Sequence, residues 1–102
     1  MPDYRNLRAF QLGRDLAIQS RPLIKRLPTD ERHALADQWR RAAYSVPLNI
    51  AEGASRKGPL EFRRHLDIAR GSLHELEVIF ELMIAQGYFG TKGVVVLSRL
   101  AA

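Results

Sequence analysis

A line of polar side chains crosses an otherwise apolar stretch, residues 45–56, which read SVPLNIAEGASR. On a helix, Gln38, Ser45, Asn49 and Glu52 would follow one another at spacings of seven, four and three residues and share one side. A carboxylate buried among them would have a raised pKa unless it were paired, and could then act as a general acid or base. If the protein is an enzyme, Glu52 is therefore its candidate general acid or base.

A structural role explains the same residues more fully. Pro47 lacks an N–H, so the carbonyl of Ala43 loses its helical donor, and nearby polar side chains can satisfy freed backbone groups. Arg56 follows Glu52 at i, i+4 and can neutralise its charge. Polar groups in a helical seam fix register at some cost in stability. We therefore favour a structural polar network of Gln38, Ser45, Asn49, Glu52 and Arg56.

The sequence lacks the residues that other kinds of active site require. The chain has no cysteine, and its three histidines, His33, His65 and His74, are isolated in sequence, whereas a metal site needs several converging ligands. Glu-x-x-His pairs, a P-loop and a dinucleotide glycine pattern do not occur. We expect no catalytic residues, no metal, no cofactor and no small-molecule substrate.

The basic residues offer a second kind of site. The formal net charge is +5, with 13 Arg among 16 bases, and residues 1–57 carry all of the excess. Such a surface can bind phosphates without sequence preference, or it can serve contacts between subunits. The candidate surface for nucleic acid or a partner is Arg40, Arg41, Arg56, Lys57, Arg63 and Arg64.

Proline and glycine divide the chain into the elements that must hold these residues. We expect a helix over about residues 6–26 that is kinked or ended by Pro22, and a second helix that starts at Thr29. A third begins at Pro59, and Phe62, Leu66, Ala69, Leu73, Leu76, Phe80 and Met83 give it an unbroken a/d stripe. A brief helix from about Thr91 completes the expected elements.

Long helices with short connections predict an all-α fold. We expect one domain over residues 1–102, an antiparallel up-and-down bundle of three long helices plus a short C-terminal helix, which is a four-helix bundle with a truncated fourth helix. The N-terminus lacks a secretory signal, and the longest charge-free run, about residues 42–51, is too short to span a membrane. We therefore expect a cytoplasmic protein.

Two runs resemble the patterns of a known family, the 23S rRNA intervening-sequence (S23) or four-helix bundle proteins. The first is residues 38–53 (QWRRAAYSVPLNIAEG), and the second includes residues 71–77 (GSLHELE), preceded by Phe62, Leu66, Ile68 and Ala69. Asn6-Leu7, Phe10-Gln11 and Leu27-Pro28 resemble its first helix and first loop, with Phe10 where a Trp is usual. The similarity covers roughly residues 4–89.

The resemblance implies a bacterial, cytoplasmic, all-helical protein without enzymatic activity that forms a homo-oligomer, typically a ring pentamer. Some members are encoded within intervening sequences of ribosomal RNA genes, and more distant relatives are nucleic-acid-binding accessory proteins of reverse transcriptases. We expect a non-enzymatic homo-oligomeric scaffold or accessory protein that binds RNA or DNA non-specifically through its arginine-rich surface. The alternative is a protein–protein adaptor whose arginines serve subunit contacts only.

Overall fold

A computed structural model describes residues 3–31, 33–55 and 58–88 of the 102-residue chain. They form three α-helices, α1 (Arg8–Lys25), α2 (Leu35–Ser55) and α3 (Pro59–Ala85), and two short 3-10 helices, η1 (Tyr4–Asn6) and η2 (Thr29–Glu31). These ranges contain no strand, which confirms the predicted all-α class. The brief helix expected from about Thr91 lies outside them.

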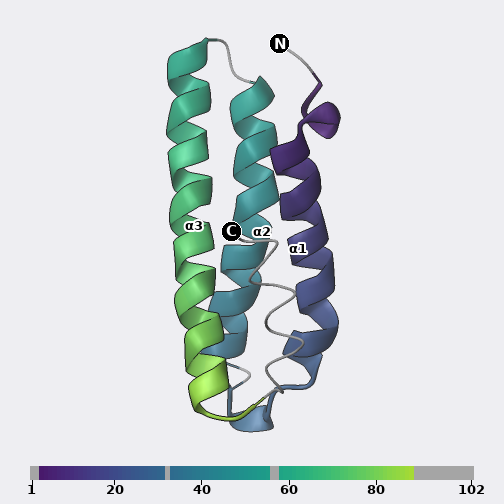
Figure 1. Cartoon of the computed structure of the whole chain (residues 1–102), viewed down its shortest axis with the longest axis vertical. Coiled ribbons are helices and arrows are strands. Elements are labelled where there is room, and N and C mark those ends of the chain that lie inside the picture. The colour runs from purple at the N-terminus through teal and green to yellow at the C-terminus, as the bar shows by residue number, and fades with distance from the viewer. Residues whose placement is uncertain (1–2, 32, 56–57, 89–102) are drawn as a thin grey trace.

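The middle helix, α2, packs against both of the others. Figure 1 shows α2 between α1 and α3, with the chain reversing its direction at each connection. The contact of α2 with α1 and its contact with α3 therefore involve different sides of α2. This arrangement determines which residues of different helices can meet.

The hydrophobic core is centred on Trp39 of α2, which is completely buried. Its ring meets Phe80 of α3 edge-on, with 5.4 Å between the ring centroids. On its other side, the indole N–H donates to Ser20 Oγ of α1 at 3.0 Å, and Ser20 Oγ donates to the Leu16 carbonyl at 2.8 Å. Trp39 thus contacts side chains of both neighbouring helices.

The predicted extent of α1 is confirmed, whereas the predicted start of α2 is wrong. α1 runs from Arg8 through Pro22 to Lys25, close to the expected residues 6–26, so Pro22 does not end it near Arg21. Pro22 is exposed and removes only the donor to the Ile18 carbonyl, on a side of α1 that faces solvent. Thr29 opens the 3-10 helix η2, and α2 begins only at Leu35.

The predicted start and end of α3 are confirmed. Pro59 occupies its first turn, and Gly87, with φ of 71°, follows its end. The N–H of Tyr88 donates to the Met83 carbonyl at 3.2 Å, and that of Gly87 to the Ile84 carbonyl at 3.1 Å. These two bonds form a Schellman motif, which needs a left-handed residue that glycine supplies most easily.

Helices α2 and α3 come very close together at Gly53. A Cβ on Gly53 would lie 2.7 Å from the Cβ of His65 and 3.1 Å from Cδ1 of Phe62. Real Cβ atoms do not approach other carbons so closely, so the two helices have room here only for a glycine. The contact fixes which residues of α3 lie beside the polar side chains of α2.

Candidate nucleic-acid interface

Polar side chains of α2 and α3 form a hydrogen-bonded chain where the two helices meet. Asn49 Nδ2 donates to the carbonyl and to the hydroxyl of Ser45, at 2.9 and 3.0 Å. Ser72 Oγ donates to Ser45 Oγ at 2.8 Å, and His65 Nδ1 lies 3.2 Å from Asn49 Oδ1. Because an amide oxygen only accepts, that last bond requires the proton on Nδ1 of His65.

Of the residues predicted for the structural network, the structure brings Ser45 and Asn49 together. Gln38 and Glu52 are both exposed, and Arg56 lies outside the described residues. Sequence reasoning missed His65 and Ser72, which belong to a different helix. Their spacing of seven residues, beside the apolar stripe of α3, was the available signal.

The network is suited to positioning helices rather than to acid–base chemistry. Asn49 stands between Ser45 and His65, so His65 is bonded to an amide oxygen and not to the Ser45 hydroxyl, from which a general base would remove a proton. Glu52, the candidate acid or base, is exposed rather than enclosed in a pocket. Within the described ranges, no three His, Asp or Glu side chains are grouped so as to hold a metal ion.

The predicted basic surface divides into two separate regions. Arg40 and Arg41 are exposed on α2, and Arg63 and Arg64 are exposed near the start of α3, while Arg56 and Lys57 lie outside the described residues. Arg63 and Arg64 are level with Gly53, which is 13 residues after Arg40. At 1.5 Å per residue, this separates the two pairs by about 20 Å along the molecule.

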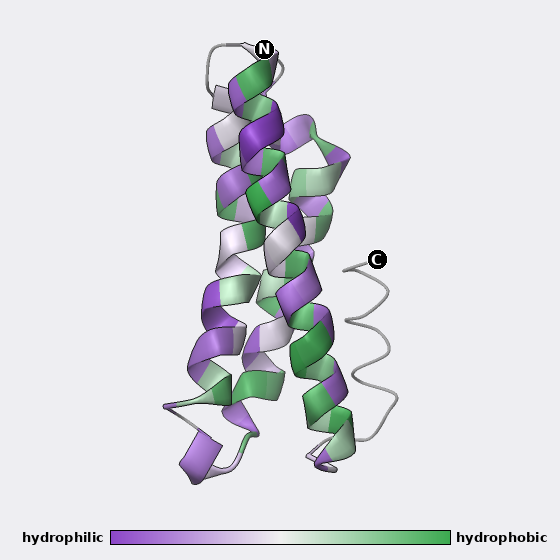
Figure 2. Ribbon diagram, turned by 90° about the vertical axis from the view of Figure 1, so that its left-hand side faces the viewer, coloured by the Kyte–Doolittle hydropathy of each residue, from purple (hydrophilic) through white to green (hydrophobic). Residues whose placement is uncertain are grey.

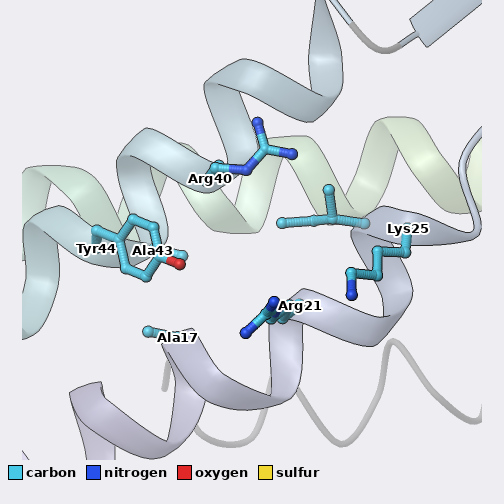
Figure 3. A pocket seen from close by; sticks show the side chains of 7 residues that line it. Ala17, Arg21, Lys25, Arg40, Ala43 and Tyr44 are labelled. Carbon is cyan, nitrogen blue, oxygen red and sulfur yellow. The ribbon is translucent and has the colours of Figure 1, made fainter.

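Two bases of α1 join Arg40 across the groove between α1 and α2. Arg21, Lys25 and Arg40, with Tyr44 and the apolar Ala17, Ile24 and Ala43, line a hollow of about 400 Å³, here called the basic hollow. Figure 3 shows side chains of both helices extending toward it. Sequence reasoning missed Arg21 and Lys25; their i, i+4 spacing indicated a shared face but not which helix lies opposite.

The basic hollow has an excess of positive charge. Among the described residues, no acidic side chain lines it. Arg40 is paired with Asp37 at 2.9 Å, but within the described ranges no ion pair is formed by Arg21 or Lys25. Like charges at i, i+4 destabilise a helix by about 0.2–0.5 kcal/mol. An anion bound between the three cations would relieve this repulsion.

By contrast, Arg63 and Arg64 share their surface with acids. The shallow hollow beside them is also lined by Leu60, Glu61 and Asp67. The two carboxylates offset the charge of the two guanidinium groups, so this region attracts an anion less strongly than the basic hollow does. The basic hollow is the better candidate site.

An apolar hollow of about 370 Å³ adjoins the basic one. Its walls include Phe10, Ile18, Pro47 and Leu48, and it shares Ala17 and Tyr44 with the basic hollow. Ile18 and Leu48 are among the most exposed large apolar side chains of the described residues. Tyr44 therefore lies at the boundary between a cationic and an apolar surface.

A further exposed apolar surface lies on α3. Figure 2 shows hydrophobic residues recurring along this helix, which faces the viewer. Ile68, Val78, Leu82 and Ile84 each expose more than 40% of their surface. None of the described helices has the length and hydropathy needed to cross a bilayer.

These features define the class: an all-α protein with a cationic hollow between two of its helices. The chain belongs to the family of 23S rRNA-intervening sequence proteins, whose family model matches residues 5–101. The match confirms the resemblance seen in residues 38–53 and 62–77, and it continues beyond residue 89, where we placed the end of the similarity. Comparison with curated proteins gives no match.

Proposed function

We propose that this protein is a non-enzymatic, homo-oligomeric scaffold or accessory protein that binds the phosphate backbone of RNA or DNA without sequence preference. The observation that supports the proposal is the basic hollow, which is lined by Arg21, Lys25 and Arg40 and by none of the acidic residues that the structure describes. Arginine and lysine are the usual partners of backbone phosphates. The family description is compatible with a role connected to ribosomal RNA.

The number of phosphate contacts sets the expected salt dependence. Three contacts per subunit give a slope of log K against log salt of about −2.7 for duplex DNA and about −2.1 for a single strand. Affinity should then fall roughly 40-fold or 20-fold, respectively, between about 50 and about 200 mM salt. A titration of labelled RNA and DNA with the full chain measures both slopes.

A matched pair of arginine variants makes the test specific to the basic hollow. Arg21→Ala should weaken binding and make the slope shallower by about 0.7–0.9. Arg70→Ala removes an exposed arginine from α3, outside the groove between α1 and α2, and should leave the slope unchanged. The absence of salt-sensitive binding at about 50 mM salt, or equal effects of the two variants, would refute the proposal.

The exposed apolar residues on α3 favour a second candidate, the protein–protein adaptor. Large exposed apolar patches mark interaction surfaces, and Ile68, Val78, Leu82 and Ile84 are available for contacts between subunits. Such contacts would support assembly into a homo-oligomer, for which we propose a ring pentamer. Light scattering that gives an oligomeric mass, together with no binding of RNA or DNA at low salt, would favour the adaptor.

A further inference from the structure

Three hollows adjoin one another along the groove between α1 and α2. A third hollow of about 250 Å³, lined by Leu27, Pro28 and Ala36, shares Lys25 and Arg40 with the basic hollow. The basic hollow in turn shares Tyr44 with the apolar hollow, which extends to Ala51. From Ala36 to Ala51 the groove is about 22 Å long, since a helix rises 1.5 Å per residue.

Resting on the proposed nucleic-acid function, we propose that the ligand of this groove is a single strand of RNA or DNA. Its phosphates lie against Arg21, Lys25 and Arg40, and one of its bases stacks on the ring of Tyr44. At the 3.4 Å spacing of a stacked strand, the groove holds at most about six nucleotides. The proposal names the ligand class, which the salt dependence alone does not.

The order of the surfaces along the groove, with a basic hollow next to an apolar one, suits a single strand. Single-stranded nucleic acid is bound by a positively charged groove that follows the backbone and by aromatic rings on which bases stack. Here the basic hollow supplies the charge, and the apolar hollow next to it offers a surface for bases. The two surfaces meet at Tyr44, half of whose surface is exposed.

Tyr44 is the aromatic residue of the groove that is best placed to stack. Tyr4 already has Arg5 over its ring at 4.7 Å and Phe10 at its edge at 4.9 Å. Among the described residues, the Tyr44 ring has no aromatic or cationic partner. A base can therefore reach the exposed half of Tyr44 without displacing an aromatic or cationic side chain from its ring.

Other occupants fit the groove less well. The bases of a duplex are stacked inside the helix, so they cannot lie on the Tyr44 ring. A second copy of this chain carries a net charge of +5 and is a poorer match for the basic hollow than a polyanion. A single strand meets both surfaces at once.

The test compares a labelled single strand of about 12 nucleotides, within the usual site sizes, with a duplex of the same sequence. Tyr44→Ala should lower the affinity for the single strand roughly tenfold, within the range of about 5- to 150-fold that one base stack represents. It should leave the affinity for the duplex within about twofold. Tyr44→Phe should keep both affinities, because the ring remains.

Two more variants serve as controls. Tyr44→Leu keeps apolar bulk but removes the aromatic face. It should lose single-strand affinity as Tyr44→Ala does, which separates the loss of the ring from any disturbance of packing by the small alanine. Leu60→Ala shortens an exposed apolar side chain at the start of α3 and should change neither affinity. The melting temperature and the mass by light scattering are measured for every variant.

The possible failures are distinguishable. If Tyr44→Ala and Tyr44→Leu weaken both ligands equally or neither, while Arg21→Ala weakens both, the single-strand inference is wrong and phosphate binding remains. If neither ligand binds in a salt-sensitive way, the proposed function is wrong and the inference falls with it. If the Tyr44 variants change only the mass, the groove holds a second copy of the chain, which also overturns the inference.

Discussion

The close approach of α2 and α3 at Gly53 predicts opposite effects of the same substitution at two glycines. Alanine at Gly53 would place its Cβ 2.7 Å from the Cβ of His65 and 3.4 Å from the carbonyl oxygen of Phe62. These neighbours are the stem of a side chain and the backbone, so they cannot move aside cheaply. At Gly71, in the middle of α3, the same Cβ would have no neighbour within 4 Å.

The magnitudes follow from helix propensity and from overpacking. Alanine is favoured over glycine in a helix interior by about 0.8–1.0 kcal/mol, so Gly71→Ala should stabilise the protein by up to about 1 kcal/mol. Gly53 lies in the last turn of α2, where alanine gains no more helix propensity than it does at Gly71. Overpacking at this position costs about 1–3 kcal/mol and offsets that gain. The two variants should therefore differ in free energy of unfolding by about 1–3 kcal/mol.

Thermal unfolding followed by circular dichroism measures the difference. For a chain of this length, 1 kcal/mol corresponds to roughly 5 °C in Tm. Gly71→Ala should melt up to about 5 °C above the wild type, and Gly53→Ala should melt about 5–15 °C below Gly71→Ala. If both variants raised Tm by the same amount, α2 and α3 would not be as close as the structure has them and the reasoning would be refuted.

Two more predictions concern hydrogen bonds between distant segments. Ser20→Ala removes the acceptor of the Trp39 indole N–H and should lower the free energy of unfolding by about 1 kcal/mol in a urea titration; the exposed Ser55→Ala is the control, and equal effects would contradict the prediction. Tyr88 Oη donates to Glu31 Oε2 at 2.7 Å, and this bond raises the pKa of Tyr88 above 10.0. Because the pKa of Tyr88 is higher in the folded than in the unfolded protein, this hydrogen bond contributes fully to stability below the unfolded-state pKa. Its contribution is lost as pH rises through the folded-state pKa. Tyr88→Phe should therefore melt below the wild type at about pH 8, and the difference should disappear above the raised pKa; a gap that persists there would contradict the assignment.

The elements of the fold could be predicted where the local pattern decides them. The apolar stripe of α3 and its terminal signals at Pro59 and Gly87 are of this kind. Both terminal signals agree with the structure, and every residue of the stripe except Leu66 is buried or partly buried. Whether Pro22 ends the helix could not be predicted, because the effect of a proline depends on the side of the helix that it faces, and the local sequence does not show which side that is. The start of α2 at Leu35 rather than Thr29 likewise depends on how the connection packs.

The site was less predictable because it is made by contacts between helices. The sequence shows that Arg21 and Lys25 lie off the apolar face of α1, but it does not show that Arg40 stands across from them. In the same way, the bond between Asn49 and His65 joins residues 16 positions apart. Grouping Arg40 with Arg63 was an error of this kind, because the two residues share a chemistry but do not lie close together in the fold.

The position of Trp39 gives the protein an internal optical reporter. It is the only tryptophan in the chain, and it touches Phe80 of α3 and Ser20 of α1 while being fully buried. Its fluorescence should therefore shift toward the red if either outer helix separates from α2, without any attached dye. Because the indole is shielded from solvent, a ligand in the groove that leaves the helices in place should hardly alter this emission, so that occupancy and unfolding can be followed as independent signals in one sample.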